Sequence, residues 1–347
     1  MNRKDEHVSL AKAFYNKQNN EFDTVRLVHN PLPQTAVAKV ELQTAVAGLT
    51  LKCPFYINAI TGGSEKTKKI NHDLAVIAKE TDLMIATGSV SAALKDPFLA
   101  DTYTIMREVY PEGIILANIG AGASLMQAQE AVNLFHADAL QIHLNAPQEL
   151  VMPEGDRDFS NWKELIKEIN QGISIPLIVK EVGFGMTREA IDELAELGVR
   201  TVDISGRGGT SFTQIENARR IKREFDYLTD WGQSTVTSLL EADEAQHQVE
   251  VLASGGIRHA FDIFKALCLG AKAVGVSGTI LTSLMNHGVE KTIQLIKQWQ
   301  AELQLLFTMV GAQTVQDLQH QPLVFSGATK EWCEARGISL TKYGKRQ

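Results

Sequence analysis

The sequence predicts an α/β fold of the (β/α)8 type, a TIM barrel with an N-terminal extension and C-terminal helices, on two observations. From residue 54 onward, short runs rich in β-branched residues alternate with longer amphipathic segments, which is typical of parallel βαβ units. Eight such units follow one another, and no GxGxxG follows the first strand, so a closed barrel is favoured over an open dinucleotide-binding sheet. A chain of 347 residues suits such a barrel with extensions at both ends.

The predicted strands are short, and apolar residues at three- and four-residue spacing predict the helices between them, as in Ala123–Phe135 and Thr187–Leu197. We expect one domain over residues 1–347, in which an extension (1–53) packs against a barrel core (54–287) and a helical region (288–347) follows. The predicted strands are Phe55–Ala59, Met84–Thr87, Ile114–Asn118, Ala139–His143, Pro176–Glu181, Thr201–Ser205, Val251–Ser254 and Ala273–Ser277.

Six of the eight predicted strands end in small or polar residues. In a barrel these turns share one face, the C-terminal mouth, where active sites lie. A single βα turn often contains glycine for conformational reasons alone, but the repeated pattern favours a ligand that the backbone approaches closely. The turns are Thr61-Gly-Gly63, Thr87-Gly-Ser89, Asn118-Ile-Gly120, Gly206-Arg-Gly-Gly-Thr210, Ser254-Gly-Gly256 and Ser277-Gly278.

Composition excludes several classes of protein. Hydrophobic residues make up 44% of the chain and the net charge is −7, which supports a large core and argues against nucleic acid as a partner. Cys53, Cys268 and Cys333 are far apart, so neither a disulfide framework nor a zinc site is expected. No apolar stretch reaches membrane-spanning length and the N-terminus is polar, so we expect a cytoplasmic protein without a membrane partner.

Two turns near the end of the barrel carry the strongest phosphate signal. Ser254-Gly-Gly-Ile-Arg258 leads into a helix expected from about Ala260, and Ser277-Gly-Thr279 opens another short helix. N–H groups at helix N-termini attract phosphate, and the turns after strands seven and eight are the usual phosphate site of barrels. The pattern indicates a phosphate-bearing cofactor or substrate without distinguishing them.

Lys180 ends an apolar strand and points into the barrel mouth. Because an isolated buried ammonium is costly, it must lie near an anion. One interpretation is the negatively charged edge of a reduced flavin, and the other is a structural ion pair with Glu181 or Asp203.

A second polar cluster follows the fourth strand. His143 is able to bind or protonate an anionic oxygen, Glu149 to hold Mg2+, and the non-titrating Gln148 to position a substrate. At the N-terminus, Arg3, Lys4 and His7 form a small basic cluster that, taken alone, predicts a solvated tail.

Together these residues resemble one family, the type 2 isopentenyl-diphosphate Δ-isomerases, which are FMN-dependent barrels. The resemblance spans nearly the whole chain, and its most specific segments are Gln141–Asp156 and Val179–Gly185. The other matching stretches are Arg3–His7, Ile57–Gly63, Thr87–Ser89, Ala117–Gly120, Gly208–Thr210 and Ala253–Gly256.

The resemblance implies an isomerase of isoprenoid biosynthesis that interconverts isopentenyl diphosphate and dimethylallyl diphosphate by a 1,3 proton shift. Reduced FMN would be the acid/base, Mg2+ a second cofactor, and NADPH the reductant that primes the flavin. A homotetramer or homo-octamer is also implied. One alternative is an FMN-dependent 2-hydroxy-acid oxidase, but such an enzyme needs a titratable base that the turn Ser205–Thr210 lacks. The other is a non-catalytic flavin- or phosphate-binding protein, which has no use for Gln148 and Glu149 beside His143.

The resemblance also implies roles for individual residues. Gln148 and His143 would be catalytic, Glu149 would hold Mg2+, and the N-terminal cluster would be a flap over the substrate. Val90-Ser91 departs from relatives that carry Gln-Arg, so one arginine contact to the diphosphate is missing or supplied elsewhere. The implied substrate contacts are Arg3, Lys4, His7, His143, Asn145 and Gln148, and the implied FMN contacts are Ala59, Ile60, Thr61, Ser89, Asn118, Lys180, Ser205, Thr210, Gly255, Gly256, Arg258, Ser277 and Gly278.

Overall fold

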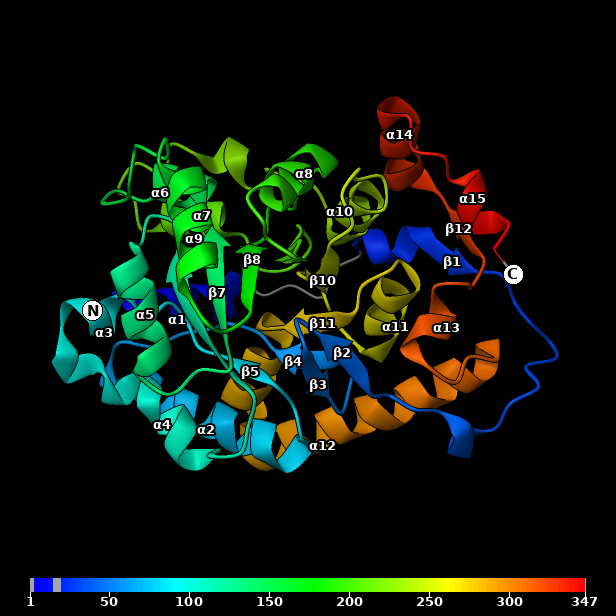
Figure 1. Ribbon diagram of the computed structural model, residues 1–347, viewed down its shortest axis with the longest axis horizontal. Coiled ribbons are helices and arrows are strands. Elements are labelled where there is room, and N and C mark those ends of the chain that lie inside the picture. Colours follow the sequence, from blue (N-terminus) through cyan, green and yellow to red (C-terminus); the bar gives the residue numbers. More distant parts are fainter. Residues whose placement is uncertain (1–2, 15–19, 347) are drawn as a thin grey trace.

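The computed structural model describes residues 3–14 and 20–346, and its centre is a closed barrel of eight parallel strands surrounded by helices (Figure 1). Neighbouring strands follow the order β10-β11-β4-β5-β6-β7-β8-β9, so each strand pairs with the next along the chain and the last, β11, pairs with the first, β4. The strands are β4 (Phe55–Ile57), β5 (Ile85–Ala86), β6 (Ile115–Gly120), β7 (Ala139–Leu144), β8 (Leu177–Glu181), β9 (Thr201–Asp203), β10 (Glu250–Ser254) and β11 (Ala273–Val276).

The eight barrel strands confirm the predicted fold class, because each predicted strand overlaps an observed one and every boundary agrees within two residues. The longer helices cover the outside of the barrel. Ser64, Ser124 and Thr187 cap three of them by accepting a backbone N–H through the side-chain hydroxyl. These helices are α2 (Glu65–Thr81), α4 (Asp101–Val109), α5 (Leu125–Asn133), α7 (Trp162–Gly172), α8 (Arg188–Glu196), α10 (Thr235–Ala242), α11 (Ala260–Cys268) and α12 (Gly278–Val310).

One detail of the C-terminal half corrects the sequence prediction. The helix that opens at Gly278 is not short: α12 runs for 33 residues, with a kink at Gly288, where φ is +80°. Further helices are α3 (Ser91–Lys95), α6 (Ala146–Val151), α9 (Phe212–Ala218), α13 (Val315–Leu318), α14 (Gly327–Arg336) and α15 (Thr341–Gly344), with 3-10 turns η1 (Glu21–Thr24), η2 (Val37–Lys39), η3 (Pro97–Leu99) and η4 (Asp226–Leu228).

The two ends of the chain are joined by a two-stranded antiparallel ribbon that the sequence did not predict. Strand β1 (Val25–Leu27) pairs with β12 (Leu323–Phe325), and the two lie side by side in Figure 1. A second ribbon, β2 (Thr44–Val46) with β3 (Leu49–Leu51), places Val46 and Leu51 in one apolar cluster with barrel-interior residues such as Tyr56. One ribbon therefore joins the extension to the C-terminal region, and the other packs it against the barrel interior.

The interior of the barrel has an apolar floor and a polar upper layer. Leu116, Ala139 and Ile178 belong to the apolar cluster, and two residues further along the same strands lie Asn118, Gln141 and Lys180. Because side chains two residues apart on a strand share a face, these polar groups also point inward, nearer the C-terminal ends. The floor excludes water from below, and the polar layer faces the mouth. In the described part of the chain, no helix combines the length and the apolar character needed to cross a bilayer.

Candidate active site

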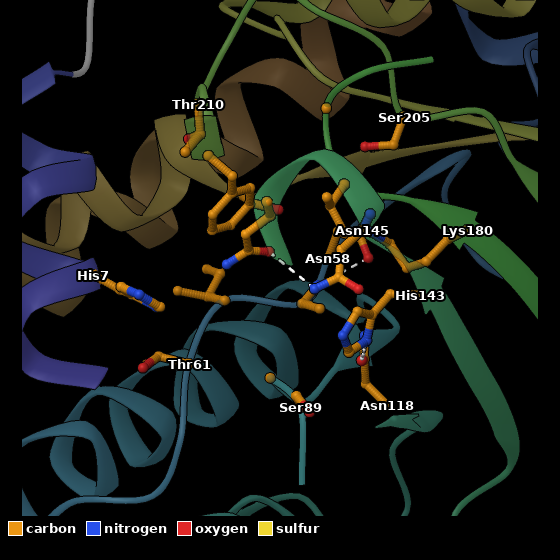
Figure 2. Close-up of a pocket in the computed structure, with 18 of the residues that line it drawn as sticks. His7, Asn58, Thr61, Ser89, Asn118, His143, Asn145, Lys180, Ser205 and Thr210 are labelled. Atoms are coloured by element: carbon orange, nitrogen blue, oxygen red, sulfur yellow. Dashed lines mark hydrogen bonds between the residues drawn. The ribbon is translucent and has the colours of Figure 1, made fainter. Parts of the chain in front are cut away.

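A cavity of about 670 Å³ opens at the C-terminal ends of the barrel strands, within the usual size range of cofactor and substrate pockets. Figure 2 shows His143, Asn118, Asn145 and Lys180 on one side of this pocket, with His7 reaching in from the opposite side. The structure brings all twenty predicted site residues to this cavity: Arg3, Lys4, His7, Ala59, Ile60, Thr61, Ser89, Asn118, His143, Asn145, Gln148, Glu149, Lys180, Ser205, Thr210, Gly255, Gly256, Arg258, Ser277 and Gly278.

The glycine turn after β10 is shaped by close backbone packing. Gly255 has φ +92°, and a Cβ at this position would lie 2.0 Å from the Gly206 carbonyl oxygen, so any side chain would clash with backbone. Gly256 has φ +75°. At the next strand end, Ser277 and Gly278 line the cavity where α12 begins, and the first N–H groups of a helix have no intrahelical partner. Both turns therefore offer backbone donors to a phosphate.

Arg258 lies beside this turn, but its guanidinium is engaged by carboxylates. Nη2 and Nη1 donate to Asp23 at 2.7 and 2.9 Å, and Nε donates to Asp262 at 2.8 Å. Asn20 adds a hydrogen bond from Nδ2 to the Gly256 carbonyl oxygen at 2.6 Å. The segment that follows the first helix thus holds the glycine turn, and two carboxylates share the charge of Arg258.

Lys180 is a buried cation that does not form the ion pairs considered from the sequence. Nζ donates to the main-chain oxygen of Glu181 at 2.5 Å, while the Glu181 carboxylate accepts the backbone N–H groups of residues 182, 183 and 184. Asp203 accepts hydrogen bonds from Tyr56, Asn58, Ser205 and Ser254. Burial lowers the pKa of Lys180, and the nearby charges of Asp203 and Glu181 oppose that shift. The ammonium is therefore left beside the cavity, where an anion would stabilise it.

His143 is held at the end of β7 by Asn118. The ring Nδ1 and the Asn118 Oδ1 are 2.7 Å apart, and Asn118 Nδ2 donates in turn to Gln141 at 3.1 Å. Burial, together with the charges of Lys180 and Lys4, lowers the pKa of His143 to about 3. This shift favours the neutral imidazole at physiological pH.

Asn145, Gln148 and Glu149 form a hydrogen-bonded set at the start of α6. Asn145 Nδ2 donates to Glu149 Oε1 at 2.8 Å and lies 3.3 Å from Gln148 Oε1. The other Glu149 oxygen accepts the Asp156 N–H at 3.0 Å. Among the residues that the structure describes, no three His, Cys, Asp or Glu side chains gather as a metal cage. A cation at Glu149 would therefore need oxygens from a substrate or water, the usual pattern for Mg2+.

Glu216 on α9 is the main residue that sequence reasoning missed. Its side chain is fully buried, and its carboxylate accepts hydrogen bonds from Gln148 Nε2 at 3.0 Å and Arg219 Nη1 at 2.5 Å. His7 Nε2 lies 2.9 Å from the same carboxylate. Burial disfavours ionisation of Glu216, but interactions with His7, Gln148 and Arg219 outweigh it and lower the pKa to about 2. Glu216 therefore connects the N-terminal segment with the end of the cavity near Gln148.

The N-terminal basic cluster lies on a helix over the cavity, and the solvated tail predicted from the cluster alone is wrong. Helix α1 (Arg3–Phe14) places Arg3, Lys4 and His7 on the cavity wall. Burial, reinforced by Arg3, lowers the pKa of Lys4 to about 8. Besides the contact of His7 with Glu216, Glu6 pairs with Arg219 at 3.2 Å. The helix is thus fastened to α9 through two acidic–basic contacts.

The segment that departs from the family pattern is polar but uncharged at the cavity. Val90 is buried at the start of α3, and the hydroxyls of Ser89 and Ser91 are 3.0 Å apart. Lys95, one helical turn after Ser91, also lines the cavity. The structure therefore places a cation at the cavity one helical turn beyond Ser91.

Comparisons with known proteins give a consistent result. The family model for FMN-dependent dehydrogenases matches residues 121–324. An isopentenyl-diphosphate delta-isomerase of Latilactobacillus sakei is 50% identical over 339 residues, and one of Staphylococcus aureus is 46% identical over 338 residues, with 97% of each chain covered in both alignments.

Solved structures show the same fold at low identity. A flavocytochrome b2 with benzoylformate has a TM-score of 0.69 and 18% identity, covering 96% of this chain and 88% of its own. A mandelate oxidase with a monooxide FMN adduct has a TM-score of 0.65 and 16% identity, covering 92% of both chains. These likenesses concern the fold alone.

Proposed function

We infer the function from family membership: this chain belongs to the isopentenyl-diphosphate delta-isomerases, which align with it over nearly their whole length, and to the FMN-dependent dehydrogenase family. We propose that it interconverts isopentenyl diphosphate and dimethylallyl diphosphate by a 1,3 proton shift. The observation that carries this is one cavity that joins the backbone phosphate turns, the adjacent buried side chains of Lys180 and His143, and the polar residues Asn145–Glu149 under α1.

The residues fit FMN. Glycine turns at two helix starts suit its phosphate, and Lys180 is a buried cation that lacks an ion-pair partner among the described residues. When bound and reduced, FMN supplies an electron-rich ring and the acid/base group for the proton shift. Lys180 would hold negative charge on that side of the cavity, because its ammonium is already desolvated.

The chain's own groups divide the remaining work. Arg3, Lys4 and His7 would bind the diphosphate from above, and α1 would exclude water from the cavity. Glu149 would hold Mg2+ against diphosphate oxygens, with Asn145 orienting its carboxylate.

Gln148 would lie at the hydrocarbon end of the substrate. Its Nε2 donates to the ionised Glu216, so its amide orientation is fixed. Protonation of the alkene creates positive charge, and a fixed carboxylate 3.0 Å behind the amide stabilises that charge. Val8, Trp162 and Phe212 also line the cavity and give it the apolar surface that a C5 unit needs.

The alternative functions explain less of the site. An oxidase acting on 2-hydroxy acids needs a titratable base over the flavin, which the turn Ser205–Thr210 lacks, and an arginine for the carboxylate, yet Arg207 in that turn pairs with Glu21 at 3.1 Å. A protein that only binds flavin would not need the buried carboxylate of Glu216 behind Gln148, because buried charge is costly.

We extend the proposal to the setting of the enzyme. NADPH is proposed as the reductant that primes the flavin, and a homotetramer or homo-octamer as the assembly. Cys53, Cys268 and Cys333 are all free and buried, which supports a reducing compartment such as the cytoplasm.

NMR of isopentenyl diphosphate, incubated anaerobically with the protein, Mg2+ and either reduced or oxidised FMN, tests the function directly. Formation of dimethylallyl diphosphate with reduced flavin only is expected, because the reaction needs an electron-rich ring but no net redox change. Equal rates with both flavin states, or no conversion with either, would refute it.

A further inference from the structure

A continuous chain of hydrogen bonds crosses the polar layer of the barrel and ends at His143. It begins at the buried carboxylate of Asp203, which accepts from Asn58 Nδ2 at 2.8 Å. Asn58 Oδ1 accepts from Gln141 Nε2 at 3.2 Å, Gln141 Oε1 accepts from Asn118 Nδ2 at 3.1 Å, and Asn118 Oδ1 lies 2.7 Å from His143 Nδ1. Asp203, Asn58, Gln141 and Asn118 are each at most 2% exposed.

The carboxylate of Asp203 sets the direction of this chain of hydrogen bonds. A carboxylate only accepts hydrogen bonds, so Asn58 must turn its NH2 group toward Asp203 and its oxygen toward Gln141. The Asn58 oxygen also accepts the backbone N–H of Ala59 at 2.9 Å, a contact that favours the same orientation. Gln141 and Asn118 must then align in the same sense, because a flipped amide would bring two NH2 groups or two oxygens together in a buried site.

We propose that Asp203, acting through Asn58, Gln141 and Asn118, fixes His143 as the tautomer with its proton on Nδ1, so that Nε2 presents a lone pair to the cavity. The Asn118 oxygen at the end of the chain requires an N–H donor, and Nδ1 is the atom that it meets. A Cβ built at Gly120 would lie 3.5 Å from Nε2, so a residue without a side chain lies beside this nitrogen. Asp203, Asn58 and Gln141 are positioning residues, since they act through Asn118.

The surrounding charges do not select the tautomer themselves. Lys180 is the register partner of His143 on the adjacent strand β8, and Lys4 reaches the same wall from α1. Both cations oppose a second proton on the ring, but a neutral ring carries one proton whichever nitrogen holds it. Hydrogen bonds to the ring therefore decide between the nitrogens: the Asn118 oxygen meets Nδ1, and the backbone of Ile119 also contacts the ring.

This inference deepens the proposed function and rests on it for the identity of the oxygen that Nε2 meets. A lone pair at Nε2 accepts either a proton already carried by the diphosphate or a proton taken from solvent when the anion binds. In both cases one proton is shared between His143 and a diphosphate oxygen, a tighter contact than a neutral N–H donor would give.

The tautomer is measured by NMR of the FMN-loaded protein labelled with 15N-histidine, with the His143 signals assigned from a His143→Gln variant. The wild type should show at least about a tenfold excess of the Nδ1–H form, which corresponds to about 1.4 kcal/mol. Asp203→Asn keeps the shape of the side chain but lets it donate, so the chain can reverse and the His143 signals should shift toward the Nε2–H form.

Tyr56→Phe is the matched control, because it removes a different donor to Asp203, at 3.2 Å, without breaking the chain. It should leave the tautomer unchanged. Gln141→Met, which removes the middle link, should give mixed tautomers if Asp203→Asn does not fold. Adding Asn118→Asp to either variant restores an obligatory acceptor at Nδ1 and should restore the Nδ1–H form.

Two results would overturn the proposal: an Nε2–H form in the wild type, or an unchanged Nδ1–H form in both Asp203→Asn and Gln141→Met. Neither result depends on turnover. If the Nδ1–H tautomer is present but isomerase activity is absent, the proposed function is contradicted. The inference that the hydrogen bonds fix the tautomer is not affected.

Discussion

Replacing Glu216 by glutamine tests the link between helix α1 and Gln148 with the smallest change in shape. The carboxylate is fully buried and meets three nitrogens, Gln148 Nε2 and Arg219 Nη1 through hydrogen bonds and His7 Nε2 at 2.9 Å. A glutamine presents one oxygen and one NH2 group, so at least one of the three nitrogens must face another donor.

The expected loss follows from that geometry. A hydrogen bond to a buried charged group contributes roughly 1.5–3 kcal/mol, and losing one such bond to Gln148 or His7 lowers kcat/KM about ten- to a hundredfold. FMN affinity should change little, because Glu216 contacts Gln148 and His7, which are proposed to meet the substrate rather than the flavin. The assay is isomerisation kinetics with reduced flavin, with FMN titration and thermal unfolding on the same preparation.

Glu6→Gln is the matched control for this experiment. Glu6 pairs with the same Arg219 but is partly exposed, and an exposed ion pair contributes about 0–1 kcal/mol, so its variant should stay within several-fold of the wild type. A folded, yellow Glu216→Gln enzyme with kcat/KM within about threefold of the wild type would refute the reasoning.

The other predictions concern the flavin side, the metal and the helix over the cavity. Lys180→Ala should weaken binding of reduced FMN about tenfold more than that of oxidised FMN, because a buried cation beside the reduced ring is lost. Spectroelectrochemistry should then show a flavin midpoint potential about 30 mV lower than in the wild type. An unchanged potential would contradict this role of Lys180. Glu149→Gln should raise the Mg2+ requirement and the substrate KM by about tenfold or more in magnesium titrations, whereas wild-type dependence on Mg2+ would show that another group holds the ion. Arg3→Ala combined with Lys4→Ala should leave a folded yellow protein whose substrate KM rises at least about tenfold; near-wild-type kinetics would mean that α1 does not contact the diphosphate. Because the folded pKa of Lys4 is lowered to about 8, its charge is present below that pH and lost above it, so kcat/KM should fall as pH rises through about 8. Lys4→Arg, which stays charged, should move that limb to higher pH, and an unmoved limb would assign it to another group.

The fold was predictable because it depends on short-range patterns. Buried parallel strands are continuous apolar runs, and six of the turns after them carry glycine or small polar residues. The candidate site was predictable in part for the same reason, since parallel strands bring their C-terminal ends to one mouth. Any residue at a strand end was therefore close to the cavity by topology alone.

What could not be predicted depends on contacts between distant segments. Glu216 follows a glycine-rich turn in an ordinary polar helix, and only the packing of α9 beside α6 and α1 brings it to Gln148 and His7. Strand β1 has three residues, too few for a periodicity signal, and its partner β12 lies almost 300 residues later. The carboxylates around Arg258 have the same origin, because Asp23 reaches it from the N-terminal extension.

The ribbon of β1 and β12 also orders events during synthesis of the chain. Asn20 and Asp23, which hold the glycine turn, immediately precede β1, and the partner strand at residues 323–325 leaves the ribosome after every barrel strand. Folding steps that join such distant segments are slow, since the loop between them must close first. A nascent chain can thus complete its barrel strands before Asn20 and Asp23 contact the phosphate-binding turn at Gly256 and Arg258. Firm capture of a nucleotide cofactor is then a late event, and a ribosome that stalls before residue 323 releases a barrel with this turn unbraced.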